Sequence, residues 1–72
     1  MVKTVEIDMK KVKEMTLKKL MSFADLAKSA NLSLATLFAL QAKRRKASER
    51  TLYKIAAALD VSPADIIKEE TL

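Results

Sequence analysis

The stretch SFADLAKSANLSLATLFAL, from Ser22 to Leu40, decides the fold. It opens on the pattern Ser22-x-x-Asp25, which is a capping box that starts a helix. Apolar residues then recur at the helical spacing of three and four, at Phe23, Leu26, Ala27 and Ala30. The pattern predicts a short helix with one apolar face.

A tight turn and a second helix follow. Asn31 is placed where the chain can turn sharply, because Asn tolerates a left-handed backbone better than most residues. Ser33 supplies an N-cap for the second helix, in which Leu37 and Leu40 share one face. Leu32, within the turn, is expected to pack into the core. Two helices joined by so short a turn form a unit that projects its second helix outward.

Composition limits the chain to one small helical domain without enzymatic machinery. Its 72 residues supply a single core, and helix formers dominate while Gly is absent. There is no Cys and no His, which removes disulfides, thiolate metal sites and the commonest acid–base catalyst. Without Gly, a phosphate-cradling loop is excluded as well. We therefore expect no catalytic residues, metal, cofactor or small-molecule ligand.

Positive charge gathers just after the second helix of the unit. Residues 28–54 hold seven basic residues and one acidic residue. Four of the basic residues are consecutive, from Lys43 to Lys46, and Arg50 follows. Such a local cationic focus favours a polyanion, although a solvated loop that aids solubility is the alternative. No stretch resembles a signal peptide or a membrane span, so a cytoplasmic protein without membrane contact is expected.

The flanking segments predict three further helices and an extended arm. Residues 1–7 alternate apolar and polar side chains, typical of an arm that either frays or pairs with its copy in a second subunit. Asp8, Ser48 and Ser62 are capping residues that start helices, and Pro63 fits the first position of the last one.

Apolar side chains at helical spacing give these helices their inner faces. The expected core positions are Met9, Val12, Met15, Thr16, Leu52, Ile55, Ala56, Leu59, Ile66 and Ile67. Tyr53 lies off this stripe and is expected to be half exposed. Together the segments predict an all-α fold of five short helices in one domain, residues 1–72. The bundle spans residues 8–67, and residues 68–72 form a tail.

From Val12 to Ile67 the sequence resembles the Cro/repressor-type, lambda repressor-like helix-turn-helix family of bacterial and phage DNA-binding regulators. The resemblance is carried by SFADLAKSANLS, LATLFAL, KRRKAS and TLYKIAAALDVSPADII. It implies five α-helices, of which the third enters the major groove of double-stranded DNA. It also implies a transcription regulator. Because one such module buries limited surface on DNA, useful affinity calls for a homodimer on two half-sites, with the N-terminal strand and the fifth helix as candidate dimer contacts.

The resemblance assigns roles to individual residues. Those expected to face the bases are Ser33, Leu34, Ala35, Thr36, Phe38 and Ala39. Those expected to lie on phosphates are Ser22, Phe23, Lys43, Arg44, Arg45, Lys46 and Arg50. Three positions that are commonly glycine in the family are occupied by Leu20, Asn31 and Lys43, and Lys43 is expected to adopt a left-handed conformation unless the helix runs on.

The predicted recognition helix departs from the family in being apolar. Reading guanine or adenine directly uses Arg, Asn or Gln, and the outward positions Leu34, Ala35, Phe38 and Ala39 offer none of these. Three interpretations remain. The side chains contact thymine methyl groups, they form the anchor of a protein-interaction module that has given up DNA, or Leu34 and Phe38 fold back onto the bundle.

Overall fold

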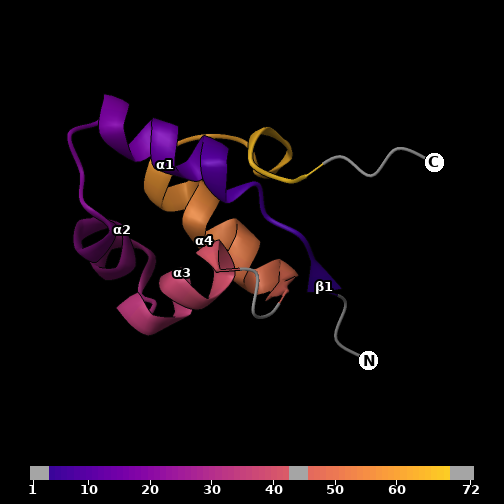
Figure 1. Cartoon of the computed structure of the whole chain (residues 1–72). Coiled ribbons are helices and arrows are strands. Elements are labelled where there is room, and N and C mark those ends of the chain that lie inside the picture. The colour runs from indigo at the N-terminus through magenta and orange to yellow at the C-terminus, as the bar shows by residue number, and fades with distance from the viewer. Residues whose placement is uncertain (1–3, 43–45, 69–72) are drawn as a thin grey trace.

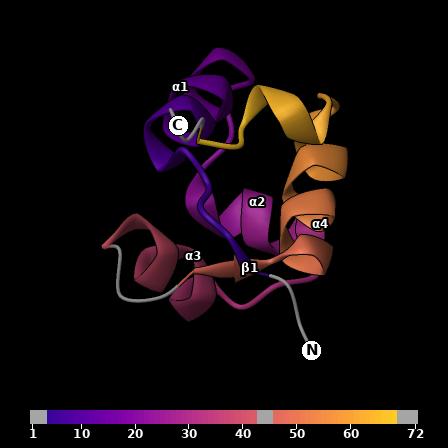
Figure 2. The ribbon, with the colours of Figure 1, turned by 90° about the vertical axis from the view of Figure 1, so that its right-hand side faces the viewer.

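The structure, a computed structural model, describes residues 4–42 and 46–68. Its elements are β1 (Thr4–Val5), α1 (Met9–Lys18), α2 (Phe23–Ala30), α3 (Leu34–Gln41), β2 (Ala47–Ser48), α4 (Glu49–Leu59) and the 3₁₀ turn η1 (Pro63–Asp65). Figures 1 and 2 show α2 and α3 below α1 and η1. None of the helices in the described ranges is long and apolar enough to cross a membrane.

Each α-helix begins at the capping residue that the sequence predicts. In all four, a side-chain oxygen accepts a hydrogen bond from the backbone N–H three residues further on. The capping residues are Asp8, Ser22, Ser33 and Ser48. Such a cap satisfies one of the N–H groups that lack a partner within the helix, and losing it costs about 1 kcal/mol.

One apolar core joins all the helices. The largest fully buried side chains among the described residues are Val12, Leu26, Leu37, Ile55, Leu59 and Ile66. They come from all four α-helices and from the residue after η1. Because α2 packs against both α3 and α4, the two-helix unit is fixed to the body of the molecule. Three residues predicted on inward apolar faces are only half buried, at the edge of the core: Met15, Phe23 and Ile67.

The prediction of five α-helices is wrong in its last member. Ser62, Pro63 and Asp65 do form the predicted helix start, with a complete capping box, but only the 3₁₀ turn η1 follows. The backbone beyond it is engaged elsewhere, since the Ile66 carbonyl accepts a hydrogen bond from the Asp8 N–H at 2.7 Å. A helix cannot continue through residues whose backbone groups are already paired with another segment.

The N-terminal arm pairs within its own chain. Thr4 and Val5 of β1 lie antiparallel to Ser48 and Ala47 of β2, as a two-stranded sheet. Further on, Ile7 forms a bridge with Ile67. The expectation that the arm frays or pairs with a second subunit is therefore wrong for the described part of the arm, which starts at residue 4. Its register brings the buried Ala47 and Ile7 against the core.

Within residues 4–42 and 46–68, three residues have a left-handed backbone: Leu20, Asn31 and Asp60, with φ of 56°, 56° and 57°. Asn31 and Asp60 end α2 and α4. Leu20 lies in the loop between α1 and α2. The expected left-handed Lys43 and the tail at 69–72 lie outside the described residues.

Candidate nucleic-acid interface

The turn between α2 and α3 is closed by backbone hydrogen bonds. Asn31 adopts φ 56° and ψ 45°, and its N–H donates to the Lys28 carbonyl at 3.3 Å. The Leu32 N–H donates to the Ala27 carbonyl at 2.8 Å. These bonds satisfy the last carbonyls of α2, as expected at a left-handed helix end. Leu32 packs half buried against the core, so the turn predicted from the sequence holds α3 at a defined angle.

Helix α3 has one face in the core and one in solvent. Leu37 and Leu40 point inward and are 0% and 6% exposed. On the opposite face Leu34 and Phe38 are 38% and 52% exposed, and Ala35 is exposed as well. Of the other positions predicted to face the bases, Ser33 is exposed, and Thr36 and Ala39 are half buried. Leu34, Ala35 and Phe38 are hereafter called the outer face of α3.

A pair of aromatic rings joins the outer face of α3 to the start of α2. The ring centroids of Phe23 and Phe38 are 5.9 Å apart, with the planes tilted by 50°. Contacts of this kind contribute about 0.5–1.5 kcal/mol beyond the area that they bury. The rings border a small hollow of about 270 Å³ that Leu17 and Met21 also line. Phe38 therefore contacts α2 through the Phe23 ring, while about half of its side chain remains exposed to solvent.

The hydroxyl groups at the start of α3 are engaged within the helix. The Ser33 Oγ accepts a hydrogen bond from the Thr36 backbone N–H at 3.1 Å and lies 2.7 Å from the Thr36 Oγ1. Both hydroxyls therefore serve the helix cap. The remaining polar side chain of α3 is the amide of Gln41, which is exposed in the last turn.

The N-terminus of α2 carries a complete capping box. The Ser22 N–H donates to the Asp25 Oδ2 at 3.0 Å, and the Asp25 N–H donates to the Ser22 Oγ at 3.1 Å. The backbone N–H of Ser22, followed by its hydroxyl, holds the pKa of Asp25 below its ordinary value of 3.8. The N–H groups of Phe23 and Ala24, in the first turn, have no acceptor within a helix and remain for an external anion.

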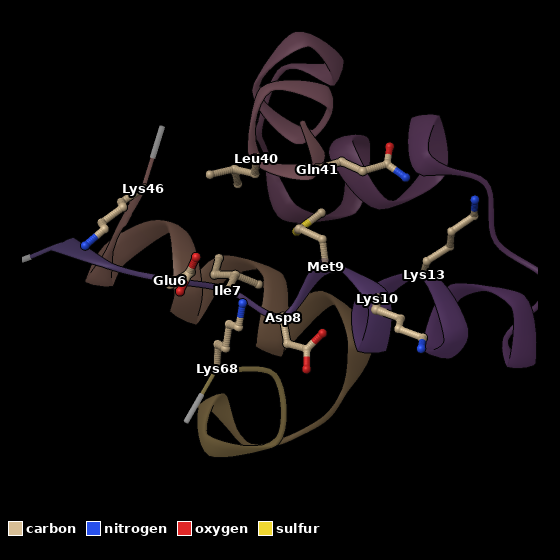
Figure 3. A pocket seen from close by; sticks show the side chains of 10 residues that line it. All are labelled: Glu6, Ile7, Asp8, Met9, Lys10, Lys13, Leu40, Gln41, Lys46 and Lys68. Atoms are coloured by element: carbon tan, nitrogen blue, oxygen red, sulfur yellow. The ribbon is translucent and has the colours of Figure 1, made fainter. Parts of the chain in front are cut away.

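Lysines from several segments surround a hollow of about 780 Å³ at the end of α3. They are Lys10 and Lys13 of α1, Lys46 before β2, and Lys68 after η1. Figure 3 shows Lys46 and Lys13 at opposite ends of the hollow, where Glu6 and Asp8 lie between them. The amino groups do not converge on one point, so the arrangement suits an extended polyanion better than a small anion.

The predicted phosphate residues are only partly brought together. Ser22 and Phe23, at the start of α2, line one hollow with Phe38, and Lys46 lines the other hollow with Leu40. Arg50 is exposed in the first turn of α4 but lines neither hollow around α3. Lys43, Arg44 and Arg45 lie outside the described residues.

Sequence reasoning missed Lys13, whereas Gln41 belongs to the predicted recognition helix and can hydrogen-bond there but was not among the predicted site residues. Both residues line both hollows, so they lie between the start of α2 and the end of α3. Lys13 follows the buried Val12, which places it at the margin of the α1 face that packs on the core. The helical periodicity of α1 places Lys13 at the edge of its buried face. Only the packing of α1 against α3 shows that this edge lies beside α3.

Comparisons with known proteins agree with this architecture. The family model for the Cro/C1-type HTH DNA-binding domain matches residues 11–71. A similar solved structure is the restriction-modification controller protein C.AhdI from Aeromonas hydrophila. It superposes with a TM-score of 0.73 at 25% sequence identity, over 78% of this chain and 85% of that one. No curated protein sequence matches the chain. On the family match, this chain belongs to the Cro/C1-type helix-turn-helix DNA-binding domain family.

Proposed function

We propose that this chain is a transcription regulator that inserts α3 into the major groove of double-stranded DNA. The proposed base-facing residues are Ser33, Leu34, Ala35, Thr36, Phe38 and Ala39. The proposed phosphate contacts are Ser22, Phe23, Lys43, Arg44, Arg45, Lys46 and Arg50, and we add Lys13. As a binding module, the chain carries out no catalysis under this proposal.

The observation that carries the proposal is the open outer face of α3. The two-helix unit matches a DNA-binding family, and its second helix leaves Leu34 and Phe38 in solvent at a cost in exposed apolar area. Within the described residues the Phe23 ring contacts Phe38, and 38% of Leu34 and 52% of Phe38 stay exposed. A major groove about 12 Å wide accommodates an α-helix, and insertion would remove this surface from water.

Charge around α3 supports the same docking. Lys13 borders the hollow beside the start of α2, and Lys46 borders the one at the end of α3. The N–H groups of Phe23 and Ala24 lie at the positive end of the α2 dipole. Cations on both sides of a groove-binding helix would meet the phosphates that line the groove.

Two copies are proposed to bind together. A single module buries about 600–1,000 Å² on DNA, which limits its affinity. A pair on half-sites about one helical turn apart doubles that contact. Because β1 already pairs with β2, a dimer contact through β1 would use only its other edge. The regulator would act in the bacterial cytoplasm, on the DNA of the bacterium or of an infecting phage.

A second candidate is a protein-interaction module. It is favoured by the apolar hollow beside Phe23 and Phe38 and by the absence of any basic residue from α3. In that case Phe38→Ala abolishes a protein complex, and duplex DNA binds only at the non-specific level.

Titration of random-sequence duplex at two salt concentrations, followed by selection for a preferred site, separates the two candidates. The Arg44→Ala/Arg45→Ala variant is expected to bind all duplexes more weakly. Each lost phosphate contact also lowers the slope of log K against log salt by about 0.9. The charge-matched control is Lys11→Ala/Lys18→Ala, which removes two lysines of α1 that line neither hollow around α3.

Unchanged affinity and slope in the double arginine variant would contradict the proposed docking. Failure of the selection to enrich any site would contradict sequence-directed binding and leave the protein-interaction module as the better candidate.

A further inference from the structure

The outer face of α3 suits one chemical group of the major groove. Base edges present hydrogen-bond donors and acceptors there, together with a single apolar group, the C5-methyl of thymine. 5-Methylcytosine carries the same methyl at the same ring position. Leu34, Ala35 and Phe38 are apolar and can recognise such a group only by contact.

Polar recognition from this face is restricted by the helix cap. The Ser33 and Thr36 hydroxyls lie 2.7 Å apart, and the Ser33 Oγ also accepts the Thr36 N–H. A hydroxyl that turned toward a base would give up part of this network. Bidentate contact with adenine is open only to Gln41, at the far end of α3.

The spacing of the two large side chains fits pyrimidines that lie two base-pair steps apart on one strand. Leu34 and Phe38 are four residues apart, so they lie about 6 Å apart along the helix axis. Two base-pair steps along one strand are about 6.8 Å. Phe38 is also held in place by the Phe23 ring at 5.9 Å, which reduces the entropy lost when its exposed half meets a ligand.

We propose that α3 recognises pyrimidine C5-methyl groups, so that 5-methylcytosine as well as thymine is read as the favoured base and cytosine methylation strengthens binding. The proposal rests on the proposed docking of α3 in the major groove. It makes the ligand a duplex whose affinity depends on how its pyrimidines are methylated.

The test uses the full chain and the site enriched from random duplex. At each position where thymine is preferred, four duplexes are compared, carrying thymine, uracil, cytosine or 5-methylcytosine on the same strand. Thymine is expected to exceed uracil, and 5-methylcytosine to exceed cytosine, by about fourfold each, which corresponds to about 0.8 kcal/mol per buried methyl. Each pair differs only in the methyl group.

Methyl groups also change the shape of DNA, and protein variants separate this effect. In Leu34→Ala/Phe38→Ala both fourfold ratios are expected to fall toward one, while Tyr53→Ala, which removes an exposed aromatic ring from α4, leaves them unchanged. Thermal unfolding checks that each variant folds. If the double variant unfolds, the single variant Leu34→Ala takes its place. The methyl ratio is then expected to fall at one thymine position of the site and to persist at the others.

The outcomes distinguish the inference from the proposed function. If no site is enriched and duplex binds only non-specifically, both are overturned. If a site is enriched but the methyl ratios equal one, the inference alone is overturned. Ratios that persist in a folded variant without Leu34 and Phe38 also overturn it, because the preference then lies in the DNA or in another residue.

Discussion

Leu20 is held in the left-handed region at φ 56° while its side chain is 92% exposed. Its N–H donates to the Leu17 carbonyl and the Met21 N–H to the Thr16 carbonyl, so the turn after α1 is fully bonded without help from the side chain. Asn31 was predictable as a left-handed residue because Asn is suited to that conformation. For Leu20 the one signal was the resemblance, in which this position is commonly glycine, since leucine itself has no preference for the left-handed region.

Leu20→Gly is expected to stabilise the fold by up to about 1 kcal/mol, since glycine has no Cβ to clash in the left-handed region. Urea unfolding measures the change. The control is Leu17→Gly, which replaces another exposed leucine but within α1, and is expected to destabilise the fold by about 1 kcal/mol. A loss of stability in Leu20→Gly as large as in the control would show that the strain is absent.

The capping box of α2 makes stability depend on pH at the acidic end. Because the folded-state pKa of Asp25 is lowered by the hydrogen bonds from Ser22, its contribution is present above 3.8 and is lost as pH falls through the lowered pKa. Asp25→Asn is expected to unfold more easily than the parent at neutral pH, with a gap that narrows below pH 3.8. Thermal unfolding from pH 7 to pH 2 measures this.

Glu14→Gln serves as the control for Asp25→Asn, because it removes one exposed carboxylate from α1. A gap between Asp25→Asn and the parent that stays constant over the whole pH range would contradict the assigned role of the Asp25 carboxylate.

Local patterns predicted the α-helices, whereas the pairing between distant segments was not visible in them. Ser22, Ser33 and Ser48 act through neighbours three residues away, so each cap could be read directly from the sequence. The end of η1 and the pairing of β1 with β2 depend on segments more than 40 residues apart. For the candidate site, the outward positions of α3 were an expectation from the family resemblance, but the contribution of α1 followed only from packing.

Lys13→Ala is therefore expected to weaken binding to every duplex by a similar factor, on the order of threefold to tenfold, and to lower the salt slope by about 0.9. The reason is its place between the start of α2 and the end of α3. Lys11→Ala removes the same charge from the same helix at a residue that lines neither hollow, and it should change little. Equal effects of the two variants would mean that only net charge matters.

At the scale of the whole molecule, the described residues form one core that holds α3 in place with its outer face exposed. The buried Leu37 and Leu40 attach α3 to a core shared by all the other helices, and α2 fixes its angle. The paired β1 and β2 and the bond from Asp8 to Ile66 hold the start and end of the described chain together. Docking is thus expected to proceed without refolding, as in other preorganised interfaces.

An NMR titration of the ¹⁵N-labelled chain with a selected duplex tests the central claim most directly. If α3 lies in the major groove with the start of α2 on a phosphate, the largest amide shifts will fall on Ser33–Gln41 and on Phe23 and Ala24. Amides around Tyr53 on α4 will move little. The largest shifts on the exposed face of α4, with α3 unchanged, would contradict the account.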